Sequence, residues 1–238
     1  MSPAKTAARP GLSREVVADR ALALADAEGL DAVTIRRLAT ELGVTPMALY
    51  WHFRTKEDLL AGLGDRVLDT VTVPERTGRW DDDLRAVLVA LVTAMRPHPQ
   101  VADQVAARIF AHPRGLALTE IAMATIGAAG FAPEPTAYLA MQGMRTVMAL
   151  VTGDPVDDSG MAAEERDEHL RQKVAMLRSL PPQQYPALVA HAEAMTYCSD
   201  VELFFELGID HYIAGLRALG ATQGGVQAPS PRAAASRS

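Results

Sequence analysis

The sequence predicts an all-α protein in which a small N-terminal head of short helices precedes a larger helical body. Apolar residues recur at helical spacing along most of the chain, and no stretch shows the sustained alternation of a β-strand. Aromatic residues make up only 5% of the 238 residues, while Ala and Leu are abundant, as is typical of packed helices. Both observations favour helices over sheets.

The helices of the head are predicted from their N-caps, which in chain order are Ser13, Thr34, Thr45 and Thr55. Gly29 ends the first helix, and Gly43 closes the turn after the second because glycine tolerates a left-handed backbone. The third helix is expected to run only from Pro46 to Phe53. Its Leu49 and Phe53 are four positions apart, so both face inward.

The body is predicted to begin at Trp80, where three aspartates open a helix, since acidic groups stabilise a helix N-terminus. Further helices are expected over residues 101–110, 114–129, 135–151, 162–179 and 198–219. We place the body at residues 80–219. The segments 1–11 and 220–238 have the composition of disordered tails.

Composition excludes several classes of protein. The longest uncharged, mostly apolar stretch, Ile121–Pro133, is shorter than the roughly 20 residues that a membrane-spanning helix needs. A lone Cys198 forms neither an intrachain disulfide nor a multi-thiolate site, and the N-terminus does not resemble a secretory signal. We therefore expect a cytoplasmic protein with no membrane partner, no cofactor and no metal site.

The net charge of −6 is unevenly distributed along the chain. Residues 1–60 hold eight basic and eight acidic side chains, so the whole acidic excess lies on residues 61–238. An acidic body disfavours nucleic acid. A neutral head whose basic groups gather on one face can still bind phosphates.

The second and third helices of the head, joined by a glycine-containing turn, match a helix-turn-helix. From spacing alone, an ordinary helical hairpin fits equally well. The residues left on the outside of the third helix favour DNA, because bulky groups such as Tyr50 and Trp51 are costly to expose without a partner. Tyr50, His52 and Lys56 can donate to phosphates, and small or apolar groups can contact thymine methyls.

Three runs of this region, Thr34–Ala39, Leu42–Pro46 and Ala48–Phe53, are followed by Lys56 and Leu59-Leu60. Together they resemble the operator-binding domain of the TetR family of repressors over about residues 12–62. The resemblance implies a DNA-binding head, placed here at residues 12–68, on a helical body that dimerises and holds an effector pocket. The body resembles the tetracycline-repressor subgroup through Gly130-Phe131, Phe204–Gly208 and Gly215-Leu216.

The resemblance assigns ten head residues to DNA: Thr34, Arg36, Thr45, Pro46, Met47, Ala48, Tyr50, Trp51, His52 and Lys56. Arg36 suits direct contact with a guanine, whereas residues 45–48 form the base-reading turn and carry few hydrogen-bonding side chains. Residues 50–52 and Lys56 match the phosphate-binding set. For Arg37 and Arg54, a solvated surface and a phosphate contact are both open interpretations.

The last helix carries an apolar arc too broad for one buried stripe, which favours burial on two sides. One side can be its own domain and the other a second copy, although a thick single-chain core is the alternative. The candidate interface comprises Leu139, Val147, Val151, Phe204, Phe205, Gly208, Tyr212 and Leu216. A homodimer would place two heads on the half-sites of a palindromic operator, about 34–36 Å apart.

Eight of the ten methionines lie between Met95 and Met195, which favours a pocket that adapts to apolar guests. Core filling is the commoner role of any single methionine. The candidate lining residues are Met95, His98, Val105, Phe110, Met123, Met144, Met148 and Met176. For His98, a hydrogen-bonded surface histidine is the competing interpretation. No histidine occurs at residues 106–109, where the tetracycline-repressor subgroup holds a metal-chelated drug, so neither tetracycline nor magnesium is expected.

These features predict a ligand-responsive transcriptional regulator, most simply a repressor that a small apolar effector releases from its operator. The alternative is a DNA-binding dimer whose body docks a protein partner and binds no small molecule; a solid core would favour it. An enzyme is disfavoured, because the histidines and Cys198 show neither metal-ligand spacing nor a nucleophile motif.

Overall fold

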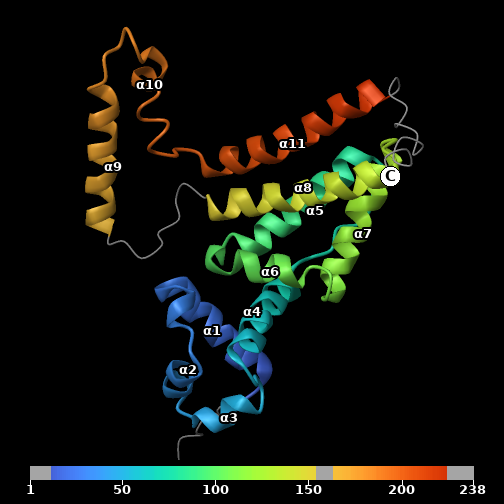
Figure 1. Ribbon diagram of the computed structural model, residues 1–238, viewed down its shortest axis with the longest axis vertical. Helices are drawn as coiled ribbons and strands as arrows, with labels where there is room; N and C mark the ends of the chain where they lie inside the picture. The colour runs from blue at the N-terminus through green and yellow to red at the C-terminus, as the bar shows by residue number, and fades with distance from the viewer. Residues whose placement is uncertain (1–11, 154–162, 224–238) are drawn as a thin grey trace, which may run out of the picture.

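Helices form the regular secondary structure of the described residues, 12–153 and 163–223, in the computed structural model (Figure 1). The expected all-α class is confirmed. The head contains α1 (Arg14–Glu28), α2 (Ile35–Leu42), α3 (Pro46–Tyr50) and α4 (Lys56–Thr70). The body contains α5 (Trp80–Met95), α6 (Ala102–Arg108), α7 (Pro113–Ala128), α8 (Pro133–Thr152) and α11 (Val201–Gln223), and an arm contains α9 (Ala163–Arg178) and α10 (Pro186–Ala190).

All four helices of the head begin at the predicted caps. The side-chain oxygens of the cap residues accept backbone N–H groups three positions on: Ser13 from Val16 at 3.3 Å, Thr34 from Arg37 at 3.2 Å, Thr45 from Ala48 at 3.3 Å and Thr55 from Asp58 at 3.1 Å. These bonds satisfy amide groups that have no partner within their own helix. Local sequence therefore sets where each helix of the head starts.

Some helix ends depart from expectation: the helix expected over residues 101–110 ends at Arg108, and the helix expected from residue 198 begins at Val201. The positive φ of 82° at Gly29 and of 66° at Gly43 closes α1 and α2 as predicted. However, α3 ends at Tyr50 rather than Phe53, because both His52 and Phe53 donate their N–H groups to the carbonyl of Leu49. At the other end of the chain, α11 continues to Gln223 instead of ending at residue 219.

The connection between head and body is α4, which packs against α1 in the head and α6 in the body (Figure 1). Gly64 makes the crossing close: a Cβ atom there would lie 2.5 Å from the backbone oxygen of Gln104. Beside it, Arg108 of α6 donates to Asp65 of α4 at 2.7 Å. The crossing of α4 and α6 is therefore closely packed.

The linker between α4 and α5 is fixed by Asp83, whose carboxylate is buried within the first turn of α5. It accepts hydrogen bonds from the Thr77 amide at 2.6 Å, the Thr77 hydroxyl at 2.7 Å and the Gly78 amide at 3.2 Å. These donors, led by Thr77, hold the pKa of Asp83 below its usual value. The segment entering α5 is thus anchored by side-chain chemistry as well as by packing.

The arm stands apart from the body in Figure 1, with α9 and α10 packed against each other. Val174, Leu177 and Ala192 fill the small interface between them. Helix α10 was not predicted, because the prolines around it favour a loop; in the structure Pro186 occupies its first turn. Of the expected tails, residues 1–11 and 224–238 lie outside the described residues, whereas residues 220–223, expected to belong to the C-terminal tail, form the last turn of α11. No described helix combines the length and hydropathy needed to cross a bilayer.

Candidate DNA-binding surface and effector cavity

The α2–α3 pair forms the helix-turn-helix at the end of the head that is farthest from α11 (Figure 1). Leu49 and Phe53 are fully buried, as predicted, and fix one side of α3 to the core of the head. Arg14 secures the C-terminal end of this helix: its guanidinium donates to the His52 carbonyl at 2.6 Å and to Asp58 at 2.8 Å. It also lies 4.1 Å from the Phe53 ring centroid.

The other side of α3 and the residues after it point away from the protein. The exposed fraction is 85% for Trp51, 68% for Met47 and 45% for Tyr50. Ala48 and His52 are half-buried beside them, and Thr34, Thr45 and Pro46 are exposed. Bulky side chains so exposed on one short, rigid segment form a surface suited to a partner.

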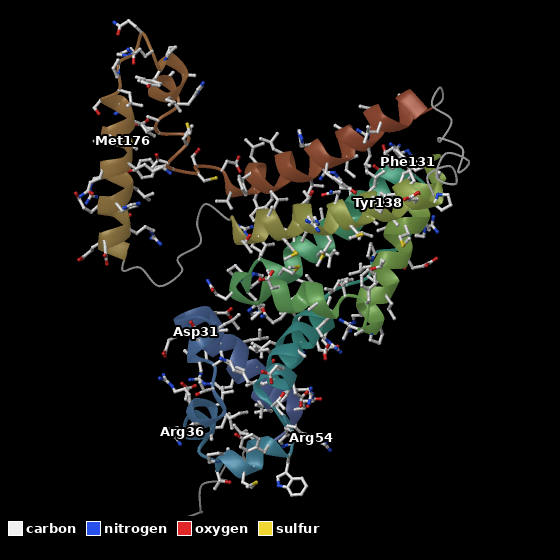
Figure 2. All side chains as sticks on the ribbon, viewed as in Figure 1. Asp31, Arg36, Arg54, Phe131, Tyr138 and Met176 are labelled. Carbon is white, nitrogen blue, oxygen red and sulfur yellow. The ribbon has the colours of Figure 1, made fainter. Side chains whose placement is uncertain are left out.

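Three unpaired cations accompany these side chains. Most arginines of the head bind carboxylates: Arg14 pairs with Asp58, Arg20 with Glu41, Arg37 with Glu28 and Glu41, and Arg66 with Asp19. Within the described part of the head, the side chains of Arg36, Arg54 and Lys56 make no hydrogen bond or ion pair. Figure 2 shows Arg36 and Arg54 at the same end of the head as α3, on either side of it.

The body contains a cavity of about 600 Å³ between α5, α6, α7, α8 and α11. Its wall is formed by Leu84, Val87, Leu88, Leu91, Ala106, Ile109, Phe110, Leu118, Thr119, Ala122, Met123, Ala137, Ala140, Met141, Gly143, Met144, Arg145, Met148 and Tyr212. Aliphatic and thioether side chains dominate this wall. A space of this size and composition suits a small apolar molecule.

Four of the eight candidate pocket residues lie on this wall, namely Phe110, Met123, Met144 and Met148. The other four lie elsewhere. Met95 and Val105 are fully buried in the core, and His98 Nδ1 lies 2.8 Å from Asp26 Oδ2 of the head. Met176 projects from α9 in the arm (Figure 2). Met141, Arg145 and Thr119 lie on the wall but were not among the predicted residues, and Tyr212, expected at an interface, also lies on the wall.

Two hydroxyl groups on the wall are already engaged with backbone. Tyr212 donates its O–H to the Leu139 carbonyl at 2.5 Å, and burial raises the pKa of Tyr212 to about 12. Thr119 donates to the Gly115 carbonyl at 2.9 Å. Gly143 leaves room for the Tyr212 ring, because a Cβ atom at position 143 would lie only 3.1 Å from Tyr212 Oη.

Four candidate interface residues have their side chains inside a single chain, which corrects their expected place. Val147, Val151, Phe205 and Leu216 are all at least 96% buried between α5, α8 and α11. Gly208 lies against Leu150 of α8, and Leu139, Phe204 and Tyr212 are half-buried. The exposed apolar residues of α11 instead include Leu203, Leu207, Ala214 and Ala218, which share one face, and Leu219. Helical periodicity indicates that both faces are apolar but not which face meets its own chain.

No group of three or more His, Cys, Asp or Glu side chains is placed to hold a metal ion in the described ranges. Among the described residues, those that line the cavity include no carboxylate, histidine or thiol.

The sequence matches two family profiles, one for each part of the molecule. Residues 17–63 match "Bacterial regulatory proteins, tetR family", and residues 73–219 match "Tetracyclin repressor-like, C-terminal domain". The chain belongs to the TetR family. The expected family and the expected architecture, a helix-turn-helix head on a helical body, are therefore confirmed.

TetR-family regulators align with nearly the whole chain. An HTH-type transcriptional regulator of Saccharopolyspora erythraea is 29% identical over 88% of this chain and 86% of its own. The class C tetracycline repressor of Escherichia coli is 30% identical over 91% of this chain and 95% of its own. The crystal structure of ActR from Streptomyces coelicolor in complex with actinorhodin has a TM-score of 0.71 at 32% identity, covering 89% and 99% of the two chains.

These similarities identify a DNA-binding transcriptional regulator rather than an enzyme. TetR-family regulators respond to small-molecule effectors and usually bind DNA as dimers. The prediction of a regulator from the exposed third helix is confirmed at this level.

Proposed function

We propose that this protein binds a palindromic DNA operator as a homodimer, represses transcription there, and releases the operator when a small apolar molecule fills its cavity. The observation that carries the proposal is the double role of α6. Ala106 and Ile109 line the cavity on one side, while Gln104 and Arg108 contact α4 on the other. One short helix thus touches both the candidate effector site and the helix that carries the head.

The DNA contacts are assigned to the exposed end of the head. The proposed set is Thr34, Arg36, Thr45, Pro46, Met47, Ala48, Tyr50, Trp51, His52 and Lys56, with Arg54 added because its guanidinium is unpaired. Arg36 can bind a guanine through its two-pronged donor geometry. The aromatic groups and remaining cations position the head on phosphates, a contact that a paired Arg37 is less able to make.

The homodimer is supported by apolar surface that one chain leaves open. Leu203, Leu207, Ala214 and Ala218 follow one another along a single face of α11, and the small residues allow close approach of a second helix. The arm exposes further apolar groups, including Met176 and Met195. A two-fold related copy would cover the face of α11 with the same face of its partner.

The effector half of the proposal rests on the cavity. About 600 Å³ lies within the range typical of small-molecule sites, and a solid core, which would have favoured a protein-docking body, is not what the described residues form. A molecule that pushes on Ala106 and Ile109 moves α6 against α4. Because close-packed helices transmit such shifts, the head turns with α4 and the spacing of the two heads changes.

Selection of bound sequences from a random DNA pool by the full-length protein tests the DNA half of the proposal. We expect an inverted repeat whose half-sites are centred about one helical turn, or 10–10.5 base pairs, apart. Enrichment of a single asymmetric site, or of no sequence at all, would contradict the operator proposal. Analytical ultracentrifugation of the protein with the selected DNA checks that two chains bind each site.

A further inference from the structure

The cavity wall carries a single charged side chain, and its charge has no partner among the described residues. Arg145 lies on α8, is solvent-exposed, and makes no hydrogen bond or ion pair. Other arginines of the body are paired: Arg85 with Asp210, Arg108 with Asp65, and Arg217 with Asp81. A guanidinium at the edge of an apolar wall, with no carboxylate paired to it, is free to bind an anion.

The hydrogen-bond donors of the cavity are unevenly placed. The hydroxyl hydrogens of Tyr212 and Thr119 are both used by backbone carbonyls. Arg145 therefore supplies the free side-chain donors of the described wall, and its exposure places them at the mouth. A ligand that follows this pattern is apolar over most of its length and carries its polar group at one end.

The mouth also favours a flat ring system. Phe110, Met123 and Met141 line the cavity and are all exposed, so an aromatic ring and two thioethers lie at its opening. Thioether sulfur makes favourable contacts with aromatic rings, and methionine adapts its shape to them. The aliphatic side chains farther in offer only dispersion contacts and burial.

We propose that the effector of this cavity is a ring-bearing apolar molecule with one anionic oxygen group, held by the guanidinium of Arg145. Arginine stays charged at all relevant pH values and presents parallel N–H groups that match a carboxylate or sulfonate. This inference rests on the proposed function, since it names the ligand class of the same cavity. It adds that charge, as well as shape, selects the effector.

The test uses two fluorescent probes that share their rings and differ in charge. 8-Anilinonaphthalene-1-sulfonate carries one sulfonate, and N-phenyl-1-naphthylamine is its neutral counterpart. Titrated with the full-length protein, the sulfonate probe binds more tightly than the neutral one. In Arg145→Gln the affinity for the sulfonate probe falls about tenfold, as expected for loss of one charge-assisted hydrogen-bonded pair, while the affinity for the neutral probe changes less than about twofold. In Arg145→Lys part of the affinity for the sulfonate probe is restored, because lysine keeps the positive charge but lacks the planar donor pair.

Two controls separate this inference from the proposed function. Arg217→Gln removes a similar cation away from the cavity and leaves both affinities unchanged. Ala140→Phe, or Ala122→Phe from α7, fills the cavity and weakens both probes, provided that circular dichroism shows an intact fold. If the filling variants weaken both probes but Arg145→Gln affects both alike or neither, the charge inference is wrong and the cavity stands. If the filling variants change nothing, both the inference and the cavity as effector site are contradicted.

Discussion

At the scale of single residues, what separates a DNA contact from a structural arginine is whether its charge is already paired. Arg37 donates to Glu41 and to Glu28, each at 2.7 Å, and these carboxylates raise the pKa of Arg37 further. Arg54 donates its backbone N–H to Asp58 at 3.0 Å, and its guanidinium forms no hydrogen bond or ion pair, only a longer-range attraction to the same carboxylate. The two arginines were equivalent candidates from sequence, and their contacts distinguish them.

Arg54→Gln is expected to weaken binding to operator and to unrelated DNA alike. Each lost phosphate contact reduces the magnitude of the slope of log K against log salt by about 0.9. Because a dimer carries two copies of Arg54, the substitution reduces it by about 1.8. Arg37→Gln serves as the matched control, because its charge is neutralised within the head. Fluorescence anisotropy over a salt series measures both slopes. Equal loss in the two variants would mean that pairing does not decide which arginines contact DNA.

Asp83→Asn is expected to lower the melting temperature at pH 7. The pKa of Asp83 is depressed in the folded protein, so its carboxylate contributes stability above the unfolded value, about 3.9, and this contribution is lost as pH falls through the folded value. The difference between wild type and variant therefore shrinks below about pH 4. Exposed Asp82, replaced by asparagine in the same way, should have little effect. A difference that persists at acid pH would contradict the assigned role.

At the scale of helices, the close crossing of α4 and α6 is the contact through which we propose that cavity and head are coupled. Gly64→Ala would force a Cβ atom against the Gln104 backbone, and we expect a loss of about 1–3 kcal/mol in the free energy of unfolding. Gly127→Ala in α7 meets no atom within 4 Å and should instead gain up to about 1 kcal/mol. Denaturant unfolding distinguishes the two. Stabilisation of the protein by Gly64→Ala would show that the crossing is not tight.

The starts of the head helices could be predicted from sequence because their causes are local. Each of Ser13, Thr34, Thr45 and Thr55 accepts an N–H group three residues away, so a few letters determine the cap. The outward display of Trp51 followed from the expected inward positions of Leu49 and Phe53, although α3 itself ends at Tyr50. Such inferences need only the period of the helix.

The cavity and the outer face of α11 could not be predicted in this way, because they depend on contacts between distant segments. Periodicity predicts that Met95 and Met144 both face inward, but not that Met95 meets solid core while Met144 borders open space. In α11, Phe205 and Leu207 are both apolar, yet only the first packs on its own chain. The free charge of Arg145 likewise depends on which acids lie nearby in the fold.

At the scale of the whole molecule, the exposed face of α11 is expected to hold two chains together. Leu207→Glu places two charges near the two-fold axis and should raise the dimer dissociation constant about 100-fold or more. Leu116→Glu is the control, since Leu116 is a similarly exposed leucine on α7. Sedimentation velocity over a concentration series gives both constants. A dimer unaffected by Leu207→Glu would place the interface elsewhere.

In the proposed mechanism the cavity and the DNA surface are coupled through α6 and α4. The affinity for the selected operator, measured with and without a saturating concentration of 8-anilinonaphthalene-1-sulfonate in the cavity, tests this coupling. We predict that the probe weakens operator binding by 5–150-fold, corresponding to about 1–3 kcal/mol, and that operator weakens probe binding by the same factor. An operator affinity that stays the same while the probe occupies the cavity would contradict it.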